Sequence, residues 1–186
     1  MRIGFRMVSA LAIGAAVTAA GCGTGHRETA PTARDSAALT AYMHRIEPLR
    51  LAVNRLLEQA DPILESYRDH RISPRTAAAR FGRLEHRFAA YTTRIAALEP
   101  ATLELARLQR TYLHTYFFED AYLSALTAAL PNRDFEGLPH TANLQRAMII
   151  EWRTGLEVLA RRLGVRLPAD LAVAGRGEIA PSPEGS

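Results

Sequence analysis

A carboxylate and an amide interrupt two otherwise apolar stripes in this sequence of 186 residues. Glu119 and Gln145 stand where the three-and-four spacing of their segments expects apolar side chains. If these segments pair antiparallel across the connection at 131–133, the two residues face each other. A similar pairing across the turn at Glu99 adds Arg80. Because an arginine and an amide can together satisfy a buried carboxylate, the three residues predict one buried polar layer.

Three interpretations of these residues stay open. They either fix the register of packed helices, as polar seam residues do in coiled coils, or form a site between the helices for a ligand or a proton. In the third, the Glu119 side chain simply reaches solvent. The same antiparallel pairing places Tyr112 opposite Trp152. This aromatic pair is expected in the core and not in a ligand site.

The other residues that could do chemistry do not gather into a recognisable motif. No glutamate precedes a histidine by three residues, as di-iron bundles require, and no Cys-x-x-Cys-His is present for covalent haem. The nucleophile-elbow, P-loop and dinucleotide-binding glycine patterns are absent too. His44, His86, His114 and His140 are expected on outer helix faces. We therefore expect no metal, no cofactor and no enzymatic activity, with a non-covalent Met/His haem as the open alternative.

The start of the chain has the pattern of a leader that directs export. Arg2 and Arg6 precede a predominantly apolar stretch of thirteen residues, 8–20, a length typical of signal peptides and too short to span a membrane. Small residues then lead into the only cysteine, Cys22. A single cysteine excludes an internal disulfide framework and a multi-thiolate zinc site.

The sequence Ala-Ala-Gly-Cys ending at Cys22 resembles the lipobox of bacterial lipoproteins, a resemblance that covers residues 1–22 only. It implies cleavage between Gly21 and Cys22 and attachment of diacylglycerol to the Cys22 thiol. Two or more acyl chains would anchor the protein stably, where a single chain binds only marginally. The alternative is an ordinary secretory signal cut near Ala20, which would leave a free thiol.

Arginine supplies all of the basic charge, since each of the 23 basic residues is Arg. Removing Arg2 and Arg6 with the leader leaves 21 basic against 19 acidic residues, which does not favour a nucleic-acid partner. Arg80, Arg87 and Arg94 recur every seven residues along one flank. This flank either meets anionic lipid headgroups or is a solvated face with weak salt bridges.

Four segments carry the apolar spacing of amphipathic helices. The first covers about residues 36–68 and contains Pro48 and Pro62. We interpret it as one long helix with two bends, or as two helices if Asp61 and Pro62 begin a second one.

The next three segments have recognisable ends. Ser73 and Pro74 begin the second helix as an N-cap followed by proline, and Pro100 ends it. The third covers about 101–130. The fourth begins near 134 or 140 and ends at 163, where Gly164 and Val165 predict a left-handed cap.

Four helices with short connections predict an all-α, antiparallel up-down-up-down bundle. We divide the chain into a signal peptide at 1–21, the lipidated cysteine and a flexible tether at 22–35, the four-helix bundle at 36–164, and a disordered tail at 165–186.

The longest connection, 131–139, is expected to lie at the bundle end opposite the tether. Asn132, Arg133 and Asp134 in this loop form a candidate contact surface, or merely a solvated link.

The composition and the lipobox together resemble small, uncharacterised helical lipoproteins of high-GC Gram-positive bacteria. We therefore expect a lipid-anchored protein on the extracytoplasmic face of the cell membrane. Its expected role is non-enzymatic binding or scaffolding of an envelope protein. The alternative is a bundle that binds a small ligand or cofactor through the layer around Glu119.

Overall fold

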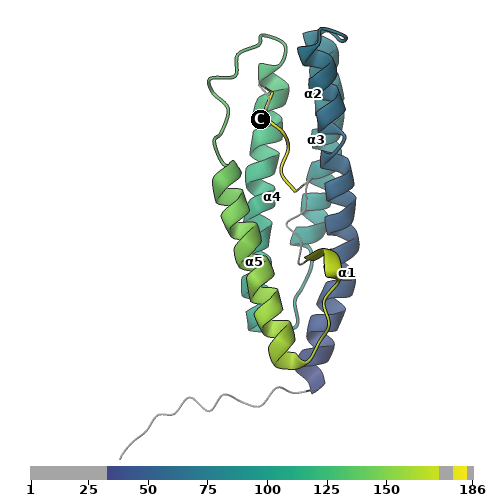
Figure 1. Ribbon diagram of the computed structural model, residues 1–186, viewed down its shortest axis with the longest axis vertical. Helices are drawn as coiled ribbons and strands as arrows, with labels where there is room; N and C mark the ends of the chain where they lie inside the picture. The colour runs from purple at the N-terminus through teal and green to yellow at the C-terminus, as the bar shows by residue number, and fades with distance from the viewer. Residues whose placement is uncertain (1–32, 172–177, 184–186) are drawn as a thin grey trace, which may run out of the picture. The chain divides into compact units, whose positions relative to one another are not determined.

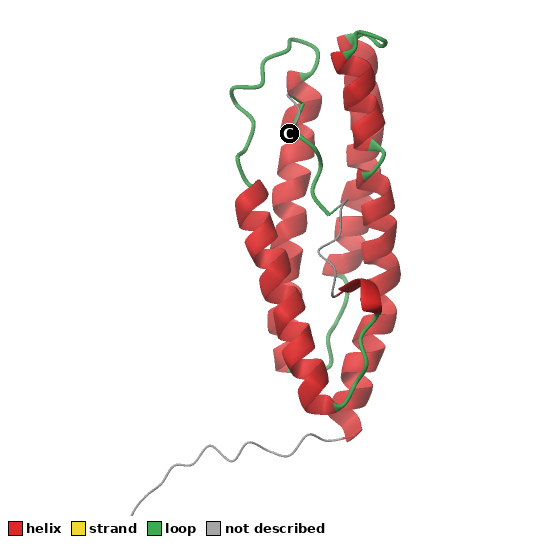
Figure 2. Cartoon of the chain, viewed as in Figure 1, coloured by secondary structure: helices red, strands yellow, loops and turns green. Residues whose placement is uncertain are grey.

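The computed structural model describes residues 33–171 and 178–183, and in these ranges it contains helices and loops but no strand (Figure 2). The predicted signal peptide and residues 22–32 of the predicted tether lie outside the described residues, whereas residues 33–35, also predicted as tether, are helical. The helices are α1 (Ala33–Leu57), α2 (Ala60–Arg68), α3 (Pro74–Ala96), α4 (Leu103–Ala129), α5 (Ala142–Leu163) and the short 3-10 helix η1 (Ala169–Leu171).

The helices form the expected antiparallel four-helix bundle, in which α1 and α2 together make the first arm (Figure 1). The start of α1 and the end of α5 lie at one end, and the Ser36 hydroxyl joins them by donating to the Leu163 carbonyl at 3.0 Å. The α2–α3 and α4–α5 connections lie at the other end (Figure 1). Packing is most extensive between α3 and α4 and between α4 and α5.

The first arm is two helices, so the interpretation as one continuous helix is wrong. Pro48 lies inside α1 and does not end it. The break falls at residues 58 and 59, where the Gln59 amide bonds back only three residues, to Leu56. Pro62 explains this break, because it has no N–H to donate to the turn before it. It is tolerated in the first turn of α2, where amides lack partners within the helix.

Local capping chemistry sets the other helix boundaries. Ser73 accepts a hydrogen bond from the Thr76 amide and begins α3, as predicted. Thr102 caps α4 in the same way through the Leu105 amide. At the end of α5, Gly164 adopts a left-handed φ of 66°.

The apolar stripes face inward and form one core. At its centre the rings of Tyr112 and Trp152 stack with centroids 3.9 Å apart and planes 10° from parallel, as their predicted opposition requires. Further buried side chains come from every main helix, namely Leu39, Ile46, Val53, Leu64, Phe81, Phe88, Leu105, Leu126, Ile149 and Leu156.

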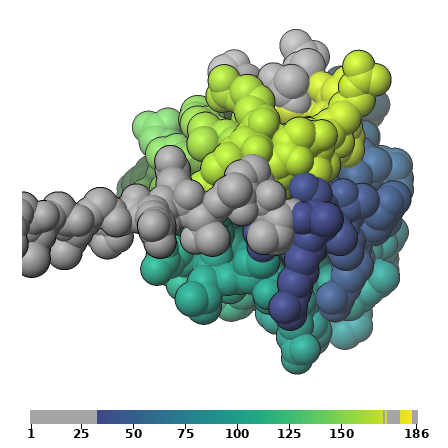
Figure 3. Space-filling view, turned by 90° about the horizontal axis from the view of Figure 1, so that it is seen from below, coloured from purple at the N-terminus to yellow at the C-terminus, as the bar shows by residue number. Residues whose placement is uncertain are grey.

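The expectation of a disordered tail is wrong for residues 165–171 and 178–183, which pack on the bundle. Leu171 is 3% exposed and Ala180 is 8% exposed. In Figure 3 the yellow-green atoms of the chain after α5 spread toward the blue atoms of α1. The reason is that Leu167, Leu171 and Ile179 reach apolar neighbours in the core. The rest of the predicted tail lies outside the described residues.

Candidate functional site

Glu119 and Gln145 meet in the bundle interior. The Gln145 side-chain Nε2 donates to Glu119 Oε2 at 2.7 Å, and Glu119 is 1% exposed. The second donor to this carboxylate is the backbone N–H of Ala180, which lies 2.8 Å from Oε1. The carboxylate of α4 is therefore held by a side chain of α5 and by the main chain of the C-terminal segment, residues 178–183.

Arg80 does not belong to this layer, and that part of the prediction is wrong. Its side chain is exposed on α3. The ring of Phe88 stacks on that of Tyr116, so residue 85 and not residue 80 lies level with Glu119. The physical reason is the connection between α3 and α4, which runs to the cap at Thr102 and offsets the two helices.

Burial raises the pKa of Glu119 from 4.5 to about 7, while the hydrogen bonds from Ala180 and Gln145 oppose the rise. Burial and the nearby Glu119 carboxylate also raise the pKa of Tyr122 to about 12. The Tyr122 hydroxyl remains protonated at neutral pH and donates to the Pro181 carbonyl at 3.0 Å. The charge of this buried carboxyl group therefore changes near neutral pH.

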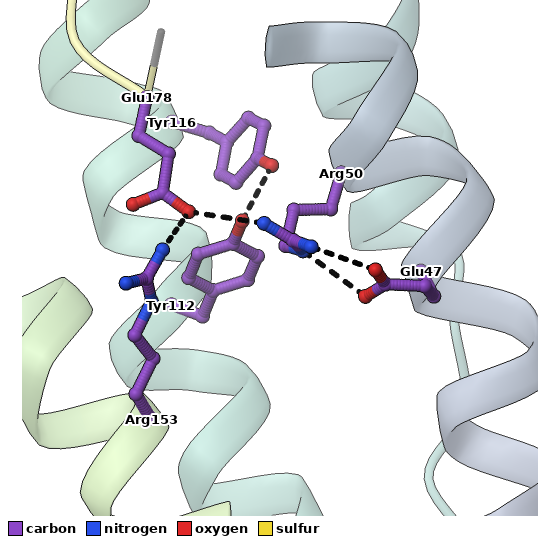
Figure 4. A network of polar contacts seen from close by, with 6 residues as sticks. All are labelled: Glu47, Arg50, Tyr112, Tyr116, Arg153 and Glu178. Carbon is purple, nitrogen blue, oxygen red and sulfur yellow. Dashed lines mark hydrogen bonds and ion pairs between the residues drawn. The ribbon is translucent and has the colours of Figure 1, made fainter. Parts of the chain in front are cut away.

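A second buried network joins the first arm, α5 and the C-terminal segment (Figure 4). Arg153 donates to Glu178 Oε1 at 2.6 Å, and Arg50 approaches the same oxygen at 3.4 Å. Arg50 also binds Glu47 through both Nε and Nη2, at 3.0 and 2.6 Å. The side chains of Arg50, Arg153 and Glu178 are 2, 8 and 7% exposed. The Glu178 carboxylate is therefore held between two desolvated guanidinium groups.

Arg50 and Arg153 were not predicted from the sequence to form this pair. Each arginine directly follows a seam residue, Leu49 or Trp152, and was therefore not distinguished from surface arginines. Its partner, Glu178, was assigned to a disordered tail. The available signal was one acidic residue followed by Ile179, an apolar residue in an otherwise small and polar stretch.

Buried tyrosine hydroxyls form further hydrogen bonds in the bundle interior. The Tyr116 hydroxyl donates to the Tyr112 hydroxyl at 3.0 Å, and the Tyr42 hydroxyl donates to Gln109 Oε1 at 2.6 Å. Trp152 Nε1 donates to Tyr42 at 3.3 Å. Burial raises the pKa of all three phenols, so they are neutral hydrogen-bonding groups.

A cavity of about 10 Å³ lies between the two networks. Its lining includes Asn54, Tyr112, Glu119 and Glu178. Asn54 Oδ1 is buried and has no hydrogen-bond partner among the described residues. The volume fits about one water molecule.

Two larger grooves flank the chain after α5. One of about 640 Å³ lies between α1 and residues 165–168, with Met43, Leu51 and Leu167 in its lining. The other, of about 660 Å³, runs along the C-terminal segment and includes Tyr122 and Phe135.

The predicted loop surface is exposed and is tied to the neighbouring connection. Asn132, Arg133 and Asp134 all reach solvent. Arg133 lies 5.5 Å from the ring centroid of Tyr67, and its Nη2 is 3.1 Å from His70 Nδ1. The α2–α3 and α4–α5 connections therefore contact each other at the end opposite the start of α1.

The basic flank of α3 is exposed along its length. Arg80, Arg87 and Arg94 all reach solvent. Arg87 donates to Gln59 Oε1 at 3.3 Å, and Arg94 lies 5.6 Å from the ring centroid of Tyr91. These contacts are those of a solvated surface.

The remaining predicted site residues, Gly21 and Cys22, lie outside the described residues. His44, His86, His114 and His140 are exposed. Across residues 33–171 and 178–183, no group of three or more His, Cys, Asp or Glu side chains could hold a metal ion. Within the same ranges, no helix has the length and apolar character needed to cross a membrane.

Comparison of the chain with protein-family models, curated proteins and solved structures found no match.

Proposed function

We propose that this protein is a membrane-anchored extracytoplasmic lipoprotein that acts as a non-enzymatic binding or scaffolding module of the cell envelope. The leader pattern ending at Cys22 supports the anchored location. The four-helix bundle supports a binding role, because its polar interior groups are arranged around a segment of the chain and not around a reaction centre.

One observation supports the binding role most strongly: residues 178–183 pack on the bundle. Glu178 is held between Arg50 and Arg153, and the Ala180 amide is held by Glu119. A surface that holds one extended segment through a buried carboxylate and a main-chain hydrogen bond has the chemistry of peptide recognition.

The alternative of a small ligand beside Glu119 has less support. The cavity there, of about 10 Å³, is far below the several hundred cubic ångströms of typical ligand pockets. The proposal therefore places binding at the surface that the C-terminal segment covers.

The proposed anchor also gives the bundle a direction. The tether leads into α1 at the end where α5 stops, so this end would face the membrane. The connections that carry Arg133 and His70 lie at the opposite end (Figure 1) and would face outward.

The test of this proposal replaces Cys22 in cells and follows both location and partners. Cys22→Ser should move the protein out of the detergent phase, or leave the leader uncleaved, and should remove its chemical crosslinks to envelope proteins. Thr24→Ser is the matched control in the tether. A Cys22→Ser chain that is still cleaved before residue 22 and still partitions into detergent and crosslinks as the parent does would contradict an anchor at this residue.

A further inference from the structure

We propose that Arg50 and Arg153 form a carboxylate-binding site for an extended acidic peptide of a partner protein, and that residues 178–183 fill this site in cis. The inference rests on the proposed binding function and gives its partner a chemistry. The partner segment carries one Asp or Glu followed by small or apolar residues, as the C-terminal segment itself does.

The charge of the site favours one anionic group. Arg50 and Arg153 bring two positive charges, and Glu47 offsets one of them through its contacts with Arg50. Among the ion pairs of the described residues, these two positive charges meet two carboxylates, Glu47 and Glu178. Guanidinium groups that are already desolvated and oriented bind a carboxylate more strongly than exposed ones do.

The contacts beyond Glu178 bind main chain. Glu119 accepts from the Ala180 amide, Tyr122 donates to the Pro181 carbonyl, and Arg68 donates to the Ser182 carbonyl at 3.5 Å. Main-chain hydrogen bonds confer affinity without requiring particular side chains. The acidic residue therefore supplies most of the specificity, and a segment with other small side chains can take the same path.

The cis segment competes with any partner because it is part of the same chain. A short linker gives such a segment an effective concentration in the millimolar range. Weakening the segment at Glu178 should therefore uncover the site to peptide in solution. The groove of about 660 Å³ along residues 179–183 leaves room beside the segment for a larger partner.

The test measures binding of a labelled peptide, acetyl-Glu-Ile-Ala-Pro-Ser-Pro-amide, to the full chain by fluorescence anisotropy. The Glu178→Ala chain should bind this peptide at least about tenfold more tightly than the parent chain, which keeps its cis competitor. Adding Arg153→Met should abolish the gain. Glu104→Ala is the matched control, because Glu104 also pairs with an arginine, Arg162, but at an exposed site.

A second peptide with Gln in place of Glu tests the role of the carboxylate and should bind neither chain. If Glu178→Ala does not fold, the two peptides are compared on the parent chain instead. The acidic peptide is then titrated to millimolar concentrations. Equal binding of the two peptides, or no tighter binding by a folded Glu178→Ala chain, would show that the ion pairs are only structural and would overturn the proposal. For the parent chain alone, no binding of the acidic peptide would overturn it too.

This outcome is separate from that of the proposed function. Peptide binding in solution does not depend on Cys22, so the peptide site can fail while anchoring and envelope crosslinking persist. Conversely, Cys22→Ser can leave partitioning unchanged while the arginine pair still binds the peptide.

Discussion

Replacing Glu119 by glutamine tests the account of the buried layer most sharply. Glutamine keeps the shape of the side chain and can still accept a hydrogen bond from the Ala180 amide. Its other terminus can pair with Gln145 after that amide turns over. The substitution therefore removes the titrating charge while it retains most of the contacts.

The magnitude follows from the pKa of Glu119, which burial raises from 4.5 to about 7. Folding raises this pKa, so the folded protein holds the proton more tightly than the unfolded chain. The resulting stabilisation is complete below about pH 4.5 and is lost as pH rises through about 7. Each pH unit in this window is worth about 1.4 kcal/mol, giving about 3 kcal/mol in total.

The assay is urea unfolding of the parent chain and of Glu119→Gln at several pH values from 4.5 to 8.5. The free energy of unfolding of the parent should fall relative to that of the variant by about 3 kcal/mol across this range. Taking the difference between the two proteins removes the titration of other groups. Parallel profiles for the two proteins would refute the reasoning.

Three further substitutions, the first with a matched control, test separate parts of the structure by the free energy of unfolding. Gly164→Ala should cost about 1 kcal/mol, because its φ of 66° disfavours a side chain, whereas Gly137→Ala, with open space at its Cβ position, should stay within about 0.5 kcal/mol. Arg153→Met should cost about 3 kcal/mol, because the buried Glu178 loses its nearer charge partner. Arg80→Ala should change the free energy of unfolding by less than about 0.5 kcal/mol in denaturant unfolding. A larger loss would show that the Arg80 side chain belongs to the buried layer.

The helices and their contacts were largely predictable because apolar spacing and caps are local signals. Trp152 and Tyr112 stack because α4 and α5 pair in the antiparallel register that the sequence predicts, although the α4–α5 connection is the longest between the main helices. The same reasoning brought Glu119 to Gln145. It failed for Arg80 because the cap at Thr102 delays the start of α4, and an offset of a few residues moves a side chain from the seam to the surface.

The C-terminal segment could not be predicted from local signals. It lies in a stretch, residues 175–186, that is rich in Gly, Pro and Ser, a composition typical of disorder. What holds it is long-range chemistry: Arg153 is 25 residues from Glu178 in sequence, and Arg50 is 128 residues away. Such pairs have no periodic pattern, so they become visible only when the fold brings the partners together.

The direct measurement of the central claim is hydrogen exchange at the Ala180 amide of the full chain. If this amide donates to buried Glu119, its exchange should be slowed by at least about tenfold relative to an unstructured peptide. Glu178→Gln should remove part of that protection while the amides of α3 keep theirs. Exchange of the parent Ala180 amide at the rate of an unstructured peptide would contradict the claim that the C-terminal segment is held on the bundle.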